Sequence, residues 1–442
     1  MVKIIQPISA MLPGLAMLGL AVAANSASAA GNTAGTLDPA FGHGGVTITS
    51  FTTATSSSTG VNPYSIALQS NGDILVLANV TITDVNIGVI TTTDMLRYTS
   101  KGELDKSFGS RGIAALPTSI GESDVLALQP NGQILVAGQL TSGADAGDFA
   151  VERLNSNGSA DTSFGSDGLA IGPALDSAPF GLVLLAETNG DILLGAGLFP
   201  TGRRQPSTTE LVRFTSAGEL DATFGTAGAA NVIGPGGCTA LAELSTGEIR
   251  VVNVNSIAQF TSTGALESGV TSGTIVASAG SQSPSTPSIF QPNGDFLFAG
   301  PSFVGEESRG HNASTEVLRF TSTGAADPTF ADPSFHFEGS GGPGIEALPS
   351  GIAVGPNGDI VVAGVQITYA QSGQTNVNGL ARLTPNGDLD PTFGSGGTVS
   401  NSIPASTGGY YQVVIQPADS KIVVIGLANN YTELTLSRYL GE

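Results

Sequence analysis

Three groups of side chains in this 442-residue chain have the chemistry of a binding site. They are the basic pair Arg203 and Arg204, the ionisable cluster Glu306, Glu307, Arg309 and His311, and the aromatic pair Tyr410 and Tyr411. Guanidinium groups hold anions, carboxylates accept hydrogen bonds, and tyrosine rings combine an apolar face with a hydroxyl group. Adjacent strand residues point to opposite faces, so Glu306 and Glu307 are interpreted as loop charge rather than as an acid–base pair. We expect these groups to contact a ligand, and we predict no catalytic residue.

The sequence lacks the short motifs that carry chemistry by themselves. It has no Asp-x-Asp-x-Asp-Gly calcium loop, no Gly-x-Ser-x-Gly elbow, no phosphate-binding loop and no His-Glu-x-x-His helix. The single cysteine, Cys238, excludes an internal disulfide framework and a thiolate metal site, and three histidines leave little for a multi-histidine centre. We therefore predict no cofactor and no bound metal. Calcium association through acidic side chains is a subsidiary hypothesis.

The charge balance excludes some partners. Thirty-six acidic residues against 15 basic ones give a net charge of −21. Nucleic-acid binding needs a basic face, and an anionic membrane would repel this chain. Only 12% of the residues are charged while 40% are hydrophobic, which is typical of a folded chain rather than a disordered one.

The first 29 residues are typical of a secretory signal peptide. One positive charge, Lys3, precedes an apolar stretch, and Ala27-Ser28-Ala29 forms a small-residue cleavage site. A membrane anchor is the alternative, but Pro13 and Gly14 interrupt the stretch, which falls short of the roughly 20 apolar residues that a spanning helix needs. We expect a secreted, periplasmic or cell-surface protein, with residues 30–36 as a short linker.

The remaining chain repeats one unit seven times. Asn-Gly or a variant of it occurs seven times between apolar runs, and a Leu-Asp-x-x-Phe-Gly string or a variant occurs seven times as well. The approximate units are 37–103, 104–159, 160–219, 220–265, 266–325, 326–388 and 389–442. The 413 residues after Ala29 give about 59 residues per unit, enough for four short strands. In the first unit these are expected near 46–51, 65–69, 74–79 and 95–99, with a type I′ turn at Asn71-Gly72.

Seven four-stranded antiparallel sheets can form a closed β-propeller or an open solenoid. The chain stops at Arg438-Tyr439-Leu440-Gly441-Glu442, inside a motif whose continuation, Leu37-Asp38, stands near the start. Joined in a circle, the two ends restore one complete repeat, whereas a solenoid would need polar caps. We therefore predict an all-β fold, a seven-bladed β-propeller closed into a ring.

Two strings identify a resemblance to a known family. RLTPNGDLDPTFGSGG (residues 382–397) and ALQPNGQILVAG (residues 127–138) resemble the delta-60 repeats, propeller-type repeats of exported bacterial proteins. The resemblance covers nearly all of the chain after the signal peptide. It implies the fold and export, and it brings no catalytic motif. The copy at residues 259–270 departs from the pattern, because it lacks the Arg, Asp, Phe and following Gly together.

The recurring charged residues are interpreted as scaffold. A side chain that recurs in every unit makes the same local contact in each, so we expect each recurring Arg to pair with a recurring Asp. A ring of carboxylates facing a ligand is the alternative. The recurring phenylalanines are expected to fill the space between neighbouring sheets; they are Phe41, Phe108, Phe164, Phe224, Phe330 and Phe393.

Alternation of the strands divides the connections between two faces. The Asn-Gly hairpins and the Leu-Asp-x-x-Phe-Gly strings share the regular face, and the long irregular connections share the other. Binding residues favour variable loops on a rigid frame. We therefore predict an exported, non-catalytic binding scaffold, expected to be monomeric, for an extracellular or cell-surface protein or polysaccharide. The alternative is a secreted hydrolase or lyase with a carboxylate or metal site at the mouth of the central channel.

Overall fold

The computed structural model contains strands and no helix in the part of the chain that it describes. This confirms the prediction of an all-β protein. The predicted signal peptide lies outside the described residues. The structure describes residues 33–51, 56–86, 88–116, 120–140, 143–173, 179–198, 208–233, 237–253, 256–267, 287–303, 312–339, 341, 344–371, 373–401 and 409–442.

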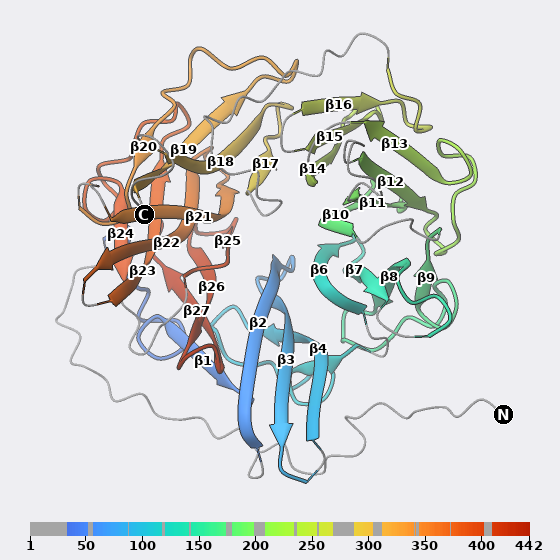
Figure 1. Ribbon diagram of the computed structural model, residues 1–442, viewed down its shortest axis with the longest axis horizontal. Coiled ribbons are helices and arrows are strands. Elements are labelled where there is room, and N and C mark those ends of the chain that lie inside the picture. The colour runs from blue at the N-terminus through green and yellow to red at the C-terminus, as the bar shows by residue number, and fades with distance from the viewer. Residues whose placement is uncertain are drawn as a thin grey trace.

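Hydrogen bonds join these strands into six sheets, which Figure 1 shows arranged around a common centre. The first sheet comprises β2 (Ser56–Leu68), β3 (Ile74–Asp84), β4 (Gly88–Tyr98) and β5 (Ile113–Ala115). The second comprises β6 (Ile120–Leu128), β7 (Ile134–Leu140), β8 (Phe149–Leu154) and β9 (Leu169–Ile171). The third comprises β10 (Pro179–Ala186), β11 (Ile192–Leu198), β12 (Thr208–Phe214) and β13 (Ala229–Ile233).

The other three sheets differ in size. The fourth has three strands, β14 (Cys238–Glu243), β15 (Ile249–Asn253) and β16 (Ser256–Phe260). The eight-stranded fifth sheet begins with β17 (Ser288–Phe290), β18 (Phe296–Phe303), β19 (Asn312–Phe320) and β20 (Ser334–Phe335). It continues with β21 (Ile345–Val354), β22 (Ile360–Ala370), β23 (Gly373–Leu383) and β24 (Thr398–Asn401). The sixth comprises β25 (Gln412–Ile415), β26 (Ile422–Ala428), β27 (Glu433–Tyr439) and β1 (Val46–Ser50).

The two ends of the described chain share a sheet. Strand β1 pairs antiparallel with β27, from Val46 opposite Ser437 to Ser50 opposite Glu433. The expectation that residues 46–51 open the sheet of the first unit is therefore wrong, because this strand is the outermost one of the sheet formed by β25–β27. The first sheet instead begins with β2 and takes β5 as its fourth strand.

The Asn-Gly hairpins form, but with a different turn from the predicted one. In the first hairpin Gly72 has a φ of 86°, whereas Asn71 keeps a negative φ. The backbone N–H of Gly72 donates to the carbonyl of Gln69 at 2.9 Å, and the N–H of Asp73 donates to the Asn71 side chain at 3.0 Å. This is a type I turn followed by a left-handed glycine, so the asparagine is selected for its side-chain acceptor rather than for positive φ.

A repeated set of contacts, which we call the latch, joins neighbouring sheets. In the second sheet the Arg153 guanidinium donates from Nε to Asp161 Oδ2 at 2.8 Å and from Nη1 to the carbonyl of Ser216, in the next sheet, at 2.6 Å. It also lies 4.3 Å from the ring centroid of Phe164, which is fully buried. Charge-assisted hydrogen bonds of this kind are among the stronger polar contacts in proteins.

The same latch recurs around the molecule, and this confirms the predicted local pairing of Arg with Asp. The other sets are Arg97 with Asp105 and Phe108, Arg213 with Asp221 and Phe224, Arg319 with Asp327 and Phe330, Arg382 with Asp390 and Phe393, and Arg438 with Asp38 and Phe41. The six phenylalanines are at most 5% exposed, as expected for rings that fill the space between sheets.

The degenerate copy keeps part of the latch. Gln259 replaces the arginine and donates to Glu267 at 2.7 Å, so the two residues that change together are still partners. On the neighbouring strand, Arg250 donates to Gln259 Oε1 at 3.2 Å and to the carbonyl of Gly294 in the next sheet at 3.0 Å. An arginine from another position therefore restores the link between the two sheets.

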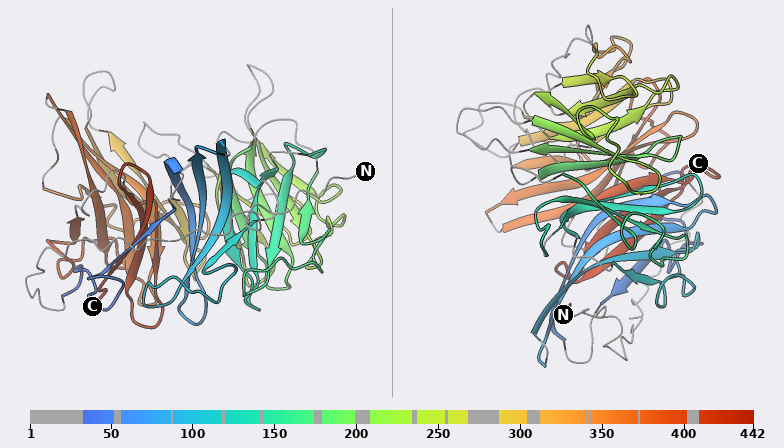
Figure 2. Two further views of the ribbon diagram at one scale, coloured as in Figure 1. Left: turned by 90° about the horizontal axis from the view of Figure 1, so that it is seen from below. Right: turned by 90° about the vertical axis from the view of Figure 1, so that its right-hand side faces the viewer.

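The latches lie at one end of the sheets, together with the Asn-Gly hairpins. In the first sheet the hairpin at 69–73 and the connection at 99–112 leave the same edge, because the strands alternate in direction. We call this end the latch edge and the opposite end the loop edge. Figure 2 shows the strands running between the two ends. The predicted division into a regular and an irregular side corresponds to these edges.

Candidate ligand-binding pocket

The connection between β19 and β20 departs from the repeat. Elsewhere the latch phenylalanine is followed by Gly-x-x-Gly, as in Phe108-Gly109, and the first glycine has a positive φ and lies against the following strand. After Phe330 the sequence reads Ala331-Asp332-Pro333 instead, and Asp332 takes a φ of 46°. Without the glycines the usual turn is lost, and β20 has only two residues.

The chain beyond β20 crosses onto the strands β22 and β23. The Gln366 side chain donates from Nε2 to the carbonyl of Glu338 and accepts the Glu338 N–H at Oε1, both at 2.9 Å. Phe337, 1% exposed, rests on Gly364 and Gly379, where a Cβ on Gly379 would stand 2.1 Å from the ring. These contacts fix the backbone, so that Phe335 and Phe337 point into the core, Glu338 is exposed and His336 is half-buried.

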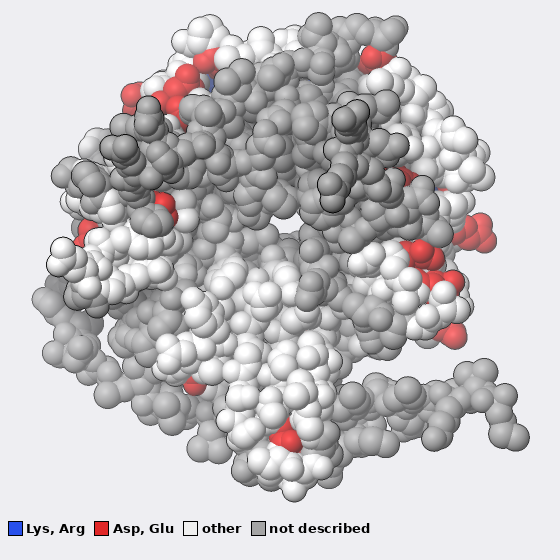
Figure 3. All heavy atoms as spheres, in the orientation of Figure 1, with Lys and Arg blue, Asp and Glu red and all other residues white. Residues whose placement is uncertain are grey.

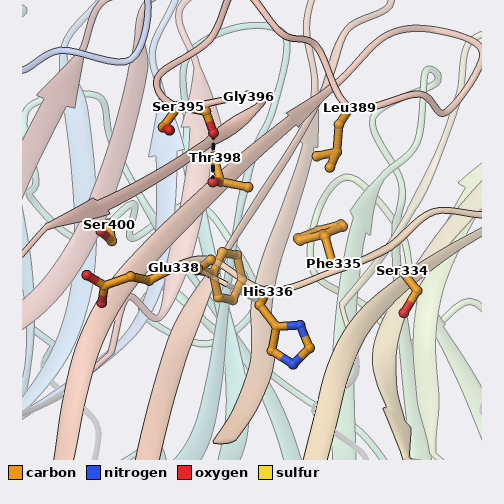
Figure 4. Close-up of a pocket in the computed structure, with 11 residues that line it drawn as sticks. Ser334, Phe335, His336, Glu338, Leu389, Ser395, Gly396, Thr398 and Ser400 are labelled. Atoms are coloured by element: carbon orange, nitrogen blue, oxygen red, sulfur yellow. Dashed lines mark hydrogen bonds between the residues drawn. The ribbon is translucent and has the colours of Figure 1, made fainter. Parts of the chain in front are cut away.

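A pocket of about 530 Å³ lies between this segment and β24. One wall consists of Ser334, Phe335, His336, Phe337, Glu338 and Gly339. The other consists of Leu389, Ser395, Gly396, Thr398 and Ser400. Figure 4 shows the Glu338 carboxylate beside Ser400, and the ring of Phe335 facing Leu389. The volume lies within the range of about 300–1,000 Å³ that is usual for small-molecule sites.

The lining combines hydroxyl groups with one carboxylate. Thr398 Oγ1 donates to the carbonyl of Ser395 at 3.3 Å. Burial lowers the pKa of the His336 imidazole below its usual value, so this ring is neutral near pH 7. Its Nε2 atom is buried and has no hydrogen-bond partner among the described residues. The pocket can therefore offer several hydrogen-bond donors and acceptors with a single formal charge, that of Glu338.

Most of the site residues predicted from the sequence lie elsewhere. Arg203, Arg204, Glu306, Glu307 and His311 lie outside the described residues, and their role as ligand contacts stays a prediction.

The predicted tyrosine pair is divided between the core and the surface. Tyr410 is 2% exposed, and its hydroxyl group bonds to that of Tyr439, with the two rings edge to face at 6.4 Å. Tyr411 is half-buried and packs against the cluster between the first and last sheets. The two tyrosines therefore do not present one aromatic surface, and only Tyr411 keeps a partly exposed ring.

The residues of the pocket were missed by sequence reasoning. A signal was present, since Ala331-Asp332-Pro333 stands where five other units have Gly-x-x-Gly, and His336 follows within three residues of Pro333. The partners of this segment, Gln366 and Ser400, lie 28 and 62 residues from Glu338, so no local motif could have revealed the pocket.

In the described ranges no group of three or more His, Cys, Asp or Glu side chains is placed to hold a metal ion. The predicted alternative of a carboxylate or metal site at the channel mouth stays a prediction. The described strands and loops also include no helix that is long and apolar enough to cross a membrane.

Comparison with known protein families finds a match for two segments of the chain. A family model described as a β-propeller domain of unknown function, DUF5122, matches residues 129–164 and 355–393. Each matched segment starts before an Asn-Gly hairpin and ends at a latch phenylalanine, Phe164 or Phe393. A comparison with curated protein sequences finds no match.

Solved structures resemble the fold at low sequence identity. A protein of unknown function from Bacteroides caccae is 15% identical, with a TM-score of 0.36, over 62% of this chain and 86% of that one. The ulvan lyase PL25, a polysaccharide lyase, is 11% identical, with a TM-score of 0.44, over 88% and 96%. A GH93 α-L-arabinofuranosidase from Fusarium graminearum is 9% identical, with a TM-score of 0.40, over 87% and 94%. Likenesses at this level carry no argument about ligand or activity.

Proposed function

We propose that this chain of β-propeller repeats is an exported, non-catalytic binding scaffold, closed into a ring of seven blades of the delta-60 type. It acts as a monomer and holds an extracellular or cell-surface protein or polysaccharide through the variable connections of its loop edge. The fold and the unequal lengths of its strands support the binding function.

The count of seven blades treats the eight-stranded sheet as two blades. Strands β19 and β21 are joined only through Asn312 opposite Ile345 and Ala313 opposite Glu346. Strand β2 contacts β6 on one side and β25 on the other, and the first strands of the other blades contact one another in sequence. Pairing of β1 with β27 supports closure between the first and last blades, because it removes an open sheet edge there.

The observation that carries the binding function is the contrast between the two edges. At the latch edge the hairpins and Arg–Asp contacts recur with little change, so their charges are used within the scaffold. At the loop edge the hairpins differ in length, since β3, β4, β22 and β23 have 11 residues each, whereas β7 has seven and β8 has six. A rigid frame with variable connections is the usual arrangement of a binding surface.

One of the long loop-edge hairpins, formed by β3 and β4, carries apolar side chains at its tip. Val85 and Val89, at the end of the β3–β4 hairpin, are 70% and 68% exposed. Exposed apolar side chains on a projecting hairpin favour contact with a partner, because burial of their surface stabilises a complex. Figure 1 shows this hairpin extending away from the centre of the molecule.

Arrays of glycans and proteins test the proposal directly. The chain from Ala30 to Glu442 is applied beside a variant with Val85→Ser and Val89→Ser. We expect a ligand to be captured and the double variant to bind it at least about tenfold more weakly, the equivalent of about 1.4 kcal/mol. Leu266→Ser is the matched control, because Leu266 is 58% exposed but lies at the latch edge. Absence of any ligand, or equal losses in both variants, would contradict the proposal.

A further inference from the structure

We infer that the pocket between β20 and β24 binds one uncharged sugar ring. This deepens the proposed function, on which it rests for the polysaccharide class of ligand, and it places a second contact on the outer rim of the molecule rather than at the loop edge. The inference depends on the chemistry of the lining, on the charge of the pocket and on the way its walls are held.

The polar groups of the pocket match a ligand that carries several hydroxyl groups. Ser334, Thr398 and Ser400 contribute hydroxyl groups. Thr398 already donates to the carbonyl of Ser395 and keeps its acceptor capacity, Ser334 shares a hydrogen bond with the Ser314 hydroxyl group, and Ser400 can both donate and accept. The Glu338 carboxylate accepts hydrogen bonds only, and its two oxygens can hold two neighbouring hydroxyl groups of a ring. Figure 4 shows these polar groups on both sides of the pocket, with Glu338 on one wall and Thr398 and Ser400 on the other.

The pocket also has an apolar part of the right kind. Phe335 is 5% exposed and lies opposite Leu389 across the pocket. A sugar ring has apolar C–H faces between its hydroxyl groups, and these can lie on the half-buried side chain of Leu389. Small-molecule sites usually combine an apolar lining with a few placed polar groups, and this pocket has that composition.

The charge of the pocket excludes acidic ligands. None of the described lining residues is Lys or Arg, and the one imidazole, His336, is neutral near pH 7. A phosphate, sulfate or carboxylate would meet Glu338 without a counter-charge, in a chain of net charge −21. A cation would meet a single carboxylate and no open aromatic cage, since Phe335 and Phe337 are both buried.

The walls of the pocket are held before any ligand arrives. The two hydrogen bonds of Gln366 fix the backbone at Glu338, and β24 is fixed by its pairing with β23 from Ala381 opposite Thr398 to Asn378 opposite Asn401. A ligand therefore loses little affinity to the ordering of the protein.

Titration with neutral sugars tests the inference. Galactose, mannose, xylose, arabinose and fucose are titrated into the full chain from Ala30 and followed by ligand-observed NMR and calorimetry. We expect at least one to bind with a Kd of about 1 mM, as is reasonable for a ligand of one ring. Glu338→Gln should weaken this binding about tenfold, and Ser400→Trp, which fills the pocket from an exposed strand position, should abolish it.

Controls separate this inference from the proposed function. Glu103→Gln removes an exposed glutamate at the latch edge and should leave sugar binding unchanged. Melting temperatures establish that each variant is folded, and Ser400→Trp provides the test if Glu338→Gln does not fold. Binding of none of the sugars, or binding that survives Ser400→Trp, overturns the inference. If the variant with Val85→Ser and Val89→Ser still loses binding of the array ligand, the proposed function stands even when the sugar inference fails.

An amine probe decides the remaining question of ligand class. Tetramethylammonium should not bind at concentrations up to that at which the best sugar saturates. If it binds more tightly than every sugar and depends on Glu338, the pocket is a cation site and the inference is overturned.

Discussion

Arg438 donates from Nε to Asp38 Oδ2 at 2.9 Å across a sequence separation of 400 residues. Both side chains are buried, and the Arg438 guanidinium lies 4.6 Å from the centroid of Phe41. It also donates to the carbonyl of Ser100 in the first sheet. One arginine thus links the C-terminal strand, the N-terminal turn and the first sheet.

Removing this arginine should destabilise the fold strongly. Arg438→Ala leaves the buried Asp38 carboxylate with only the Lys421 ammonium group, at 3.2 Å, as an ion-pair partner among the described residues. Loss of one member of a buried pair costs about 3–5 kcal/mol. We expect urea unfolding to show a loss of this order. Arg97→Ala serves as a comparison, because Arg97 and Asp105 are more exposed, at 12% and 18%, and should cost less. Equal losses in both variants would show that the terminal pair has no special role.

Truncating a latch phenylalanine should be nearly as costly. Phe164 is fully buried between the second and third sheets, in contact with the Arg153 guanidinium. Phe164→Ala should lower the free energy of unfolding by about 3–5 kcal/mol, because it leaves a cavity and removes the apolar surface of the latch. Denaturant unfolding measures this, with Val89→Ala at an exposed site as the control, and a loss below about 1 kcal/mol would contradict the account.

A single methyl group should disturb one wall of the pocket. Gly379 does not need a positive φ, but a Cβ there would stand 2.1 Å from Phe337 Cγ. Gly379→Ala should force Phe337 to move, at a cost of about 1–3 kcal/mol, and should weaken binding of the neutral sugar. Thermal melting and the sugar titration measure the two effects. Gly373→Ala is the control for space, since nothing lies within 4 Å of its added Cβ, although its φ of 126° adds backbone strain. Unchanged stability in Gly379→Ala would contradict the close packing of Phe337 against Gly379.

Glu187 should make stability depend on pH. Burial raises the pKa of Glu187 to about 7, against the opposing charge of Arg213, from an ordinary value of 4.5. The folded chain therefore holds a proton that the unfolded chain has released, and stability falls as the pH rises from about 4.5 through 7. Gln129 stands two residues before Asn131-Gly132, as Glu187 stands two residues before Asn189-Gly190, so a glutamine fits this position of the repeat. Glu187→Gln should flatten the fall in melting temperature between pH 5 and about 7.5.

Asp94 is the control for this pH effect. Burial raises the pKa of Asp94 from 3.8 to about 6. Asp94 therefore also lowers the stability of the fold as the pH rises, in the lower part of the same pH window. Glu187→Gln should leave this part in place, and addition of Asp94→Asn should remove it. A melting temperature that rises with pH across this window in the unsubstituted chain would contradict both assignments.

The latch carboxylates change stability with pH in the opposite direction, and they do so at lower pH. Burial alone would raise the pKa of Asp161, but hydrogen bonds from Ser163 and the charge of Arg153 outweigh it and hold the pKa below its ordinary value of 3.8. Their contribution is present above that value and is lost as the pH falls below it. Stability should therefore decline on both sides of a maximum between roughly pH 4 and 5.

The scaffold was predictable because its contacts repeat. Arg153 and Asp161 stand eight residues apart, as do their counterparts in every unit except the terminal pair of Arg438 and Asp38, and a spacing that recurs signals one local contact. The pairing of β1 with β27 was partly predictable from the incomplete motifs at the two ends. The turn at Asn71 was not, since a type I turn with a left-handed glycine and a type I′ turn share the Asn-Gly sequence.

The pocket could not be predicted from the sequence, because its walls meet only in three dimensions. Glu338 is fixed by Gln366 of β22, and Ser400 belongs to a strand of the following repeat. Such a site forms where one unit breaks the pattern, here at Ala331-Asp332-Pro333, and local departures from a repeat often mark functional sites. Figure 3 shows that the acidic side chains on the face drawn there are scattered, so they do not mark a binding site.

Hydrogen exchange with and without the array ligand tests the central claim most directly. Binding at the loop edge predicts slower exchange at the tip of the β3–β4 hairpin, near Val85 and Val89, with no change in the latch-edge hairpin at 69–73 or the connection at 99–112. Slower exchange confined to the latch edge would contradict the account, because the surface that varies between repeats would then not be the surface that binds.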